Sequence, residues 1–191
     1  MAASPRQPAA PEGSPPGLLR LCLDLNVWCA ALLADLRGRS GSASQRLVEI
    51  VARGDCSLGP VQLVISWGML TRLRDVLERK LRVPRIHVDT YLQAIAGYAN
   101  NGPMGTPPYL LLGGTGVVAL RDDEDAHVVE SAVAGDADML VTGNFDDFIN
   151  YRTRIVTPGR VALHDGPRKR MIIAHPSEVA AWERTAWLPI L

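Results

Sequence analysis

The side chains best suited to chemistry in this sequence are acids and amides in three short segments. These are Asp24 and Asn26 after the apolar residues 19–23, the acids at 122–125 before His127, and Asn144, Asp146 and Asp147 after residues 139–143. Aspartate is unfavourable in strands and costly when partly buried, so Asp24 directly after an apolar run indicates a functional site. The alternative is that Asp24 only caps a helix that begins near Asn26.

The other two segments also have structural explanations, which stay open at this stage. Asp122 can cap the following helix while Asp125 lies in its first turn, near the positive end of the helix dipole. Asn144, Asp146 and Asp147 can be turn residues.

Electrostatics decides what a convergence of these acids would imply. Two unit charges about 4 Å apart repel by roughly 4 kcal/mol at an effective dielectric near 20. Three bare carboxylates at one rim therefore need a cation or a proton. Oxygen ligands without a nearby cysteine or histidine pair suit Mg²⁺ or Mn²⁺, which also bind phosphate oxygens. The chemistry that follows is phosphodiester hydrolysis, in which the ion activates water and stabilises the developing charge.

The elements that must position these residues alternate between short apolar strands and amphipathic helices. Strands are expected at 19–23, 61–65, 139–141 and 171–173. Helices are expected through residues 27–32, over 44–53, from Ser66 to Leu81, from Pro84 to Tyr98, after Leu120 with Val133 on its inner face, and after Pro176. This alternation predicts a three-layer α/β/α domain with a mainly parallel sheet. Ligands of such sheets bind beyond the carboxyl ends of the strands, so the three polar segments are expected at one rim.

Residues 97–116 are rich in glycine and proline, which predicts an irregular, functional loop. Residues 109–112 and 117–120 are expected to pair around the glycines between them.

The composition limits the remaining possibilities. The chain has 191 residues, of which 47% are hydrophobic, which fits one globular domain over 18–191 after a disordered, proline-rich arm over 1–17. Basic and acidic residues number 20 each, which excludes a protein that coats polyanions generally but permits a local basic groove. Three cysteines without a C-x-x-C pair indicate neither a disulfide framework nor a zinc site. No segment is typical of a membrane span or signal peptide, so we expect a cytoplasmic protein.

Two motifs, in this order, resemble the PIN-domain ribonucleases. Residues 23–28 (LDLNVW) resemble the opening acid motif of that family. Residues 124–127 (EDAH), followed by 134–144 (AGDADMLVTGN), are similar to its most recognisable stretch. Within the family, the chain looks most like the VapC-like toxins of type II toxin-antitoxin systems, and the resemblance covers nearly the whole folded chain.

The resemblance implies a Mg²⁺- or Mn²⁺-dependent endoribonuclease in which Asp24 and Asp125 bind the metal and are catalytic. Further metal contacts are implied at Asn144, where many members have an acid, and at Asp147. Supporting roles are expected for Asn26 and for the Thr142 hydroxyl. The partners implied are RNA, a cognate antitoxin and a second copy of the chain.

One position departs from the family pattern. The family usually places a metal-site glutamate about six residues after the serine equivalent to Ser66, where this chain has Arg72. Asp75 lies one turn further and can substitute, but it can equally pair with Arg72 and Arg79 as part of a surface ion-pair row. The alternative hypothesis is therefore a catalytically weak PIN-like module that binds an antitoxin or RNA. A phosphatase with an aspartate nucleophile is a weaker alternative, because Asn26 stands where such enzymes place a second aspartate.

The segment from Thr71 to Arg85 carries a surplus of positive charge. It holds two acids and six basic residues, Arg72, Arg74, Arg79, Lys80, Arg82 and Arg85. Such a helix can bind RNA phosphates. The alternative is a solvated face of an amphipathic helix.

Overall fold

The computed structural model describes residues 17–100, 110–111, 123–150 and 152–186. Side chains at 110–111 and 123–126 lie outside this description. The expectations for the N-terminal arm, the strand at 117–120 and the cap at Asp122 also fall outside the described residues.

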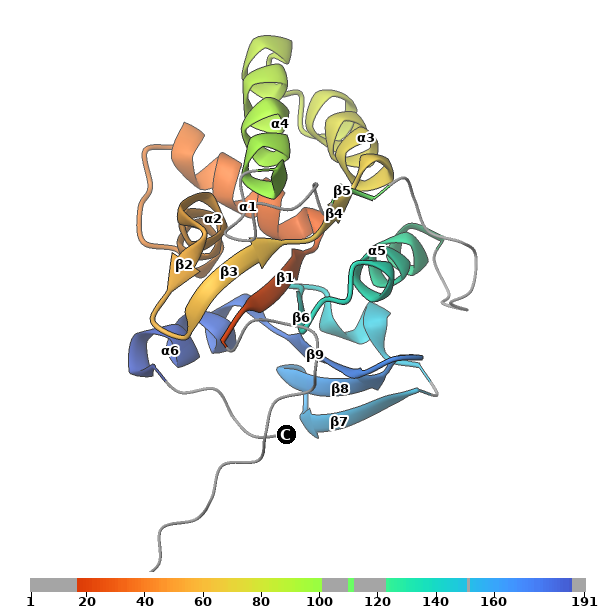
Figure 1. Ribbon diagram of the computed structural model, residues 1–191. Helices are drawn as coiled ribbons and strands as arrows, with labels where there is room; N and C mark the ends of the chain where they lie inside the picture. The colour runs from red at the N-terminus through yellow and green to blue at the C-terminus, as the bar shows by residue number, and fades with distance from the viewer. Residues whose placement is uncertain (1–16, 101–109, 112–122, 151, 187–191) are drawn as a thin grey trace, which may run out of the picture.

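A mixed sheet with a parallel centre forms the middle of the fold (Figure 1). Within the described residues it contains seven strands in the order β2-β3-β1-β6-β9-β8-β7. Their bounds are β1 Leu19–Leu23, β2 Asp55–Cys56, β3 Gly59–Leu63, β6 Met139–Val141, β7 Thr153–Thr157, β8 Val161–Asp165 and β9 Arg170–Ala174. The four central strands β3, β1, β6 and β9 are parallel to one another. The outer strands β2, β8 and β7 pair antiparallel.

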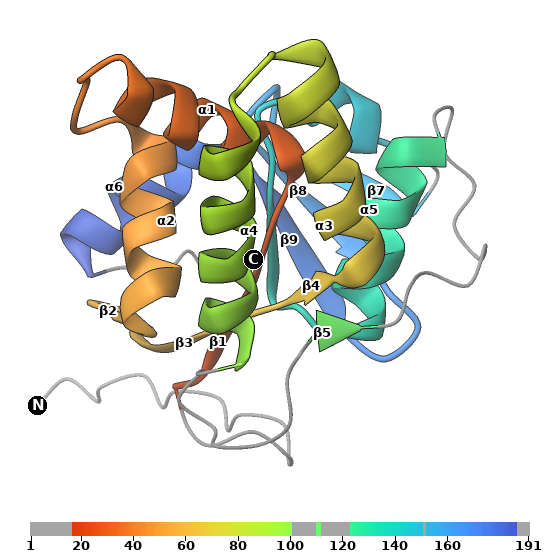
Figure 2. The same cartoon turned by 90° about the horizontal axis from the view of Figure 1, so that it is seen from above.

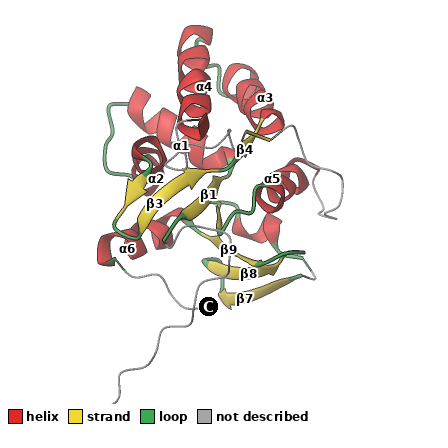
Figure 3. Ribbon diagram, in the orientation of Figure 1, coloured by secondary structure: helices red, strands yellow, loops and turns green. Residues whose placement is uncertain are grey.

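Helices cover both faces of this sheet, as the fold class predicted from the sequence requires (Figures 2 and 3). Their bounds are α1 Leu25–Leu36, α2 Ala43–Arg53, α3 Trp67–Asp75, α4 Arg85–Asn100, α5 Asp123–Ala134 and α6 Pro176–Thr185. Helices α2 and α6 lie on one side of β1 and β9, and α3 and α5 lie on the other (Figure 2). Leu21, Cys22 and Leu23 of β1 are all buried, which is typical of a parallel strand covered on both faces.

Side-chain caps explain where several helices begin. Asp24 caps α1, and its carboxylate accepts a hydrogen bond from the Leu25 N–H. Ser42 and Gln45 form a capping box at the start of α2, and Ser66 caps α3. His175 caps α6 directly after β9. Because Asp24 directly follows the buried strand β1, the start of α1 lies at the carboxyl edge of the sheet.

The chain departs from the expected elements in three places. The strand expected over 61–65 ends at Leu63, and a separate β4 (Ile65–Ser66) pairs with β5 (Leu110–Leu111) rather than continuing the sheet. The helix expected to reach Leu81 changes to the π-helix η1 (Val76–Lys80). Each π-turn adds a residue, so Leu81 leaves the buried stripe and is 37% exposed. The antiparallel hairpin of β7 and β8 was not expected at all.

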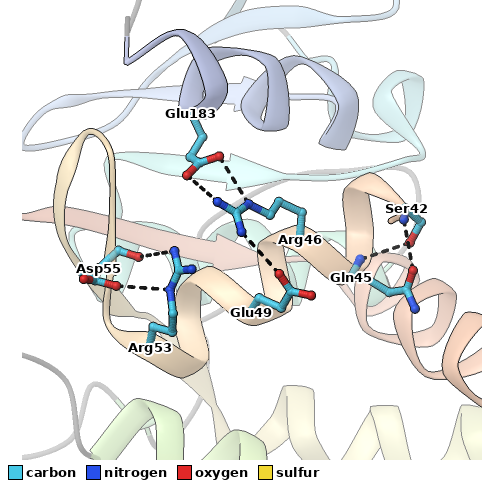
Figure 4. A network of polar contacts seen from close by, with 7 residues as sticks. All are labelled: Ser42, Gln45, Arg46, Glu49, Arg53, Asp55 and Glu183. Atoms are coloured by element: carbon cyan, nitrogen blue, oxygen red, sulfur yellow. Dashed lines mark hydrogen bonds and ion pairs between the residues drawn. The ribbon is translucent and has the colours of Figure 1, made fainter. Parts of the chain in front are cut away.

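An arginine network ties α2 to α6 (Figure 4). Nη2 of Arg46 lies 2.8 Å from Oε1 of Glu183, and Nε of Arg46 donates to the other carboxylate oxygen. Nη1 of Arg46 lies 3.4 Å from Oε2 of Glu49 on its own helix. Glu183 is buried, and its hydrogen bonds from Arg46 hold the pKa of its carboxyl below its ordinary value. The two helices on this face are therefore joined by a charge-assisted contact.

Among the described residues, no helix combines the length and apolar character needed to cross a membrane.

Candidate metal centre

Asp24 stands at the carboxyl end of the central strand β1 and is only 4% exposed. Oδ1 accepts a hydrogen bond of 2.6 Å from the Leu25 N–H. Oδ2 accepts from the side-chain amide of Asn26 and, at 2.7 Å, from the hydroxyl of Thr142. Three donors thus stabilise the negative charge of a buried carboxylate. Asp24 does cap α1, but the two side-chain donors on Oδ2 go beyond what a cap requires.

The pairing of β1 with β6 brings Asp24 and Thr142 together. Leu23 is paired with Val141, and the Asp24 N–H donates to the Val141 carbonyl at 2.9 Å. The next residue of each strand is therefore Asp24 on one side and Thr142 on the other. The segments that follow residues 19–23 and 139–141 therefore meet at one rim of the sheet, as expected from the sequence.

The side chain of Asn26 links these two segments through hydrogen bonds. Its side-chain oxygen accepts a hydrogen bond of 2.9 Å from the Gly143 N–H, which fixes the orientation of the amide. The amide nitrogen then faces the Asp24 carboxylate and lies 3.1 Å from the Thr142 hydroxyl. A second carboxylate at position 26 would face Asp24 with like charge. The phosphatase alternative needs an acid at position 26, where this chain has an amide that donates to Asp24.

The Thr142 hydroxyl has no capacity left for another ligand. It is fully buried, donates to Asp24, and accepts from the Asn26 amide and from the Asn144 N–H at 3.0 Å. A hydroxyl has one donor and two acceptor positions, so all are used. Thr142 therefore holds Asp24 in place.

Asn144 and Asp147 lie further out on the same rim. Both are exposed and line a cleft of about 490 Å³ with Gly143 and Phe145. They belong to the turn into η2, a 3₁₀ helix over Phe145–Phe148, in which the Asp147 N–H donates to the Asn144 carbonyl. The described hydrogen bonds of Asn144 and Asp147 involve their backbone groups. Their side-chain oxygens, which line this cleft, therefore remain available as ligands for a cation.

Asp125 lies in the first turn of α5, and its side chain is outside the described residues. Helix α5 contacts β1 and β6, the two strands that carry Asp24 and Thr142. Further along α5, the buried Ser131 donates a hydrogen bond of 2.9 Å to Ser66. The helix is thus anchored beside the same rim. Within the described residues, no group of three or more acids, histidines and cysteines forms a metal site.

A second cavity, of about 300 Å³, lies between α3, α5 and the start of α1. Its lining includes Leu25, Arg72, Asp75 and His127. Arg72 and His127 are exposed, and Oδ1 of Asp75 lies 3.5 Å from Nε of Arg79 in an ion pair. The ion-pair interpretation of Asp75 is therefore confirmed for Arg79, and the cavity has an arginine where the family pattern has an acid.

The basic residues of α3 and η1 differ in availability. Arg74 contacts both Glu78, at 3.1 Å, and Asp89, so its charge is already compensated. Arg79 is paired with Asp75 but remains exposed to solvent, and Lys80 is exposed as well. The structure thus divides the basic segment into one residue that holds α3 against α4 and others on the surface.

The cysteines near Asp24 are unsuited to metal binding. Burial, followed by the charge of Asp24, raises the pKa of the Cys29 thiol to about 11 and that of Cys22 still further. Both thiols therefore stay protonated at neutral pH. The donors at this rim are oxygens, which suit a hard divalent cation.

The cleft beside Asn144 also contains two residues that the sequence had not connected with it. These are Arg160, in the turn between β7 and β8, and His175, at the junction of β9 and α6. The Pro158-Gly159 pair between two β-rich runs is the signal that predicts this turn.

The fold and this rim define an α/β domain with a strand-end carboxylate at the centre of a parallel sheet. The family model of the PIN domain matches residues 20–146, about two thirds of the chain. The chain belongs to the PIN domain family, whose members are generally nucleases. Comparisons with curated proteins and with solved structures found no match.

Proposed function

We propose that this PIN-domain protein is a Mg²⁺- or Mn²⁺-dependent endoribonuclease. The observation that carries the proposal is Asp24, a buried carboxylate held by Leu25, Asn26 and Thr142 at the carboxyl edge of the sheet. Burying a charge costs free energy, and a site that uses the charge accounts for that cost. The family membership supports nuclease chemistry.

The side-chain oxygens of Asp24, Asn144 and Asp147 are of the kind that suits a hard divalent cation. Asp24 and Asp125 would hold the ion, and Asn144 and Asp147 would contribute from the outer rim. Such an ion activates water and stabilises the charge that develops on the phosphate. Asn26 and Thr142 hold the Asp24 carboxylate in one orientation, which avoids reorganisation when substrate binds.

The test of this proposal is Asp24→Asn in the purified full chain. We expect the variant to lose divalent-dependent cleavage of single-stranded RNA by at least about a hundredfold, while circular dichroism shows a folded protein. The matched control is Asp55→Asn, because Asp55 is exposed and distant from the rim in the sheet order. Cleavage by wild-type protein should stop in EDTA. Undiminished cleavage by Asp24→Asn would contradict the proposal.

A second candidate function is a catalytically weak PIN module that binds RNA or an antitoxin. Arg72 favours it, because an arginine lines the cavity beside the start of α1 and cannot bind a cation. Arg72→Glu separates the two candidates. Cleavage that appears or rises strongly in Mg²⁺ identifies a degenerate nuclease, whereas loss of an existing activity shows that Arg72 serves the native reaction.

The biological role we propose is the toxin half of a toxin-antitoxin pair in the cytoplasm, with residues 18–191 acting as one PIN-like domain. The exposed basic residues Arg72, Arg79 and Lys80 support contact with RNA phosphates. Inspection of the neighbouring reading frames for a small DNA-binding protein tests the antitoxin. Light scattering of the purified chain tests the homodimer.

A further inference from the structure

The cleft beside the candidate metal centre is built partly from the chain beyond the family match, which ends at residue 146. We call it the Arg160 cleft. Its lining includes Asn144, Asp146, Asp147, Gly159, Arg160 and His175, and its volume is about 490 Å³. One wall is the η2 segment after β6, and the other consists of the β7–β8 turn and the first residue before α6. The family resemblance therefore does not explain its basic wall.

Arg160 is held rigidly at the rim of this cleft. Its N–H donates to the Thr157 carbonyl at 3.0 Å, and its carbonyl accepts from the His175 N–H at 2.8 Å. The turn between Thr157 and Arg160 needs Gly159, because the φ of that residue is 64°. Nη1 of the guanidinium donates to the Ser177 hydroxyl at 2.7 Å and lies 4.0 Å from Glu178. The side chain is thus positioned before any ligand arrives.

The other edge of this guanidinium is available to a ligand. Contacts with described residues involve only Nη1, and the side chain is 49% exposed. Nε and Nη2 form the planar fork that binds two oxygens of one phosphate. An arginine that is held through Nη1 and keeps Nε and Nη2 for a ligand is suited to bind a phosphate.

His175 adds a neutral donor to the same wall. Its Nδ1 accepts from the Ser177 N–H at 3.3 Å and lies 3.3 Å from Nη1 of Arg160. Burial and the neighbouring Arg160 lower the pKa of His175, while Glu178 acts in the opposite direction. The lowered pKa favours the neutral ring, and because Nδ1 accepts from the Ser177 N–H, the proton of that ring lies on Nε2, which can donate to a phosphate or a base.

The opposite wall carries the exposed acids Asp146 and Asp147. An acidic peptide would be attracted by Arg160 and repelled by these carboxylates. A ribose-phosphate unit suits both walls, since its phosphate oxygens accept from arginine and its 2′-hydroxyl can donate to a carboxylate. The hydrogen-bonding pattern of the cleft thus favours a ribose-phosphate unit over an acidic side chain, which has acceptors for Arg160 but no donor for the carboxylates.

We propose that the Arg160 cleft binds a ribose-phosphate unit of the RNA strand adjacent to the bond that is cleaved. The inference rests on the proposed ribonuclease function, because the cleft shares Asn144 and Asp147 with the candidate metal centre. Arg160 acts in it as a substrate-binding residue, and the cleft sets the position of the strand relative to Asp24.

The experiment measures binding rather than cleavage. Full-length protein in EDTA is titrated into a fluorescein-labelled single-stranded RNA at low salt, and the dissociation constant is read from anisotropy. We expect Arg160→Ala to weaken binding about tenfold, as for the loss of a charged hydrogen bond. Arg154→Ala is the matched control, because Arg154 is an exposed arginine in the same hairpin that does not line the cleft. It should weaken binding no more than about twofold.

Arg160→Lys keeps the charge but not the planar fork, so it should weaken binding by about threefold. It replaces Arg160→Ala in the test if that variant unfolds at a lower temperature than the wild type. Equal effects of the Arg160 and Arg154 variants would overturn the proposal. So would competition by poly-glutamate as effective as competition by unlabelled RNA. Because no cleavage is measured, the result is independent of Asp24→Asn: either the cleft or the catalytic proposal can fail alone.

Discussion

The hydroxyl of Thr142 donates a hydrogen bond of 2.7 Å to the Asp24 carboxylate, although 118 positions separate the two residues in sequence. The contact follows from the parallel register of β1 and β6, which ends both strands at the same level. Asn26 and the Asn144 N–H complete the bonding of this hydroxyl. The carboxylate is therefore held from a second strand as well as from its own helix.

Thr142→Val should reduce RNA cleavage, although Thr142 itself binds neither the metal nor the RNA in our proposal. The substitution keeps the shape of the side chain but removes the donor to Asp24 and the acceptor for Asn26. We expect kcat for RNA cleavage to fall by about tenfold or more, with a smaller change in KM. Thr142→Ser restores the hydroxyl and should recover most of kcat. A purely structural role would instead lower stability in both variants and leave kcat of the folded fraction unchanged.

Asn26→Asp should destabilise the protein in the absence of metal. The new carboxylate would face Asp24 in place of an amide donor, and we expect the free energy of unfolding to fall by about 1 to 3 kcal/mol. Mg²⁺ should raise the melting temperature of this variant more than that of the wild type. Asn26→Ala, which removes the contacts without adding charge, is the control. Identical melting of the two variants with and without Mg²⁺ would argue against charge repulsion at this point.

The positions of several residues at this rim could be predicted from the sequence. The others could not be predicted, for physical reasons. Asp24 and Thr142 were placed correctly because both follow short apolar runs, and parallel strands end at a common edge. The hydrogen-bond roles of Asn26 depend on the orientation of its amide, which only the Gly143 N–H determines. Arg160 lies in the turn of a hairpin whose first strand is almost entirely exposed, so hydrophobic alternation gives no sign that it reaches the rim.

Glu183→Gln should alter the pH dependence of stability. The pKa of Glu183 is lowered in the folded protein by the Arg46 hydrogen bond, so its contribution is present above the unfolded value of about 4.3 and is lost as pH falls below it. We expect the variant to melt a few degrees lower at pH 7, with the difference shrinking below pH 4. Glu49→Gln, which removes the exposed partner of the same arginine, should have a smaller effect. A constant difference across pH would contradict this linkage.

Trp28→Phe should weaken the core directly behind the candidate site. The buried indole Nε1–H donates a hydrogen bond of 3.1 Å to the Leu23 carbonyl, next to Asp24. Phenylalanine removes the donor and part of the buried volume, and we expect a loss of about 1 to 3 kcal/mol in the free energy of unfolding. Denaturant titration measures it. Tyr91→Phe, which loses only a bond to the Trp28 carbonyl, should cost less because Tyr91 is half-buried.

The fold shows the same division between what sequence patterns reveal and what they miss. The strands of the parallel centre were predicted because they contain short apolar runs, as at residues 21–23. The split after Leu63 and the π-turn before Leu81 were not, because each depends on packing that has no local signature. The pairing of Ile65 with Leu110 is a long-range contact of this kind.

The place of β9 in the sheet bears on how the chain can be dissected. It pairs with β6, yet the family match stops at residue 146, well before it. A truncated fragment confined to the match would leave one side of β6 without its neighbour and α2 without Glu183. Exposed strand edges recruit other chains, so such a fragment is expected to aggregate on expression, whereas one extended through α6 should stay monodisperse.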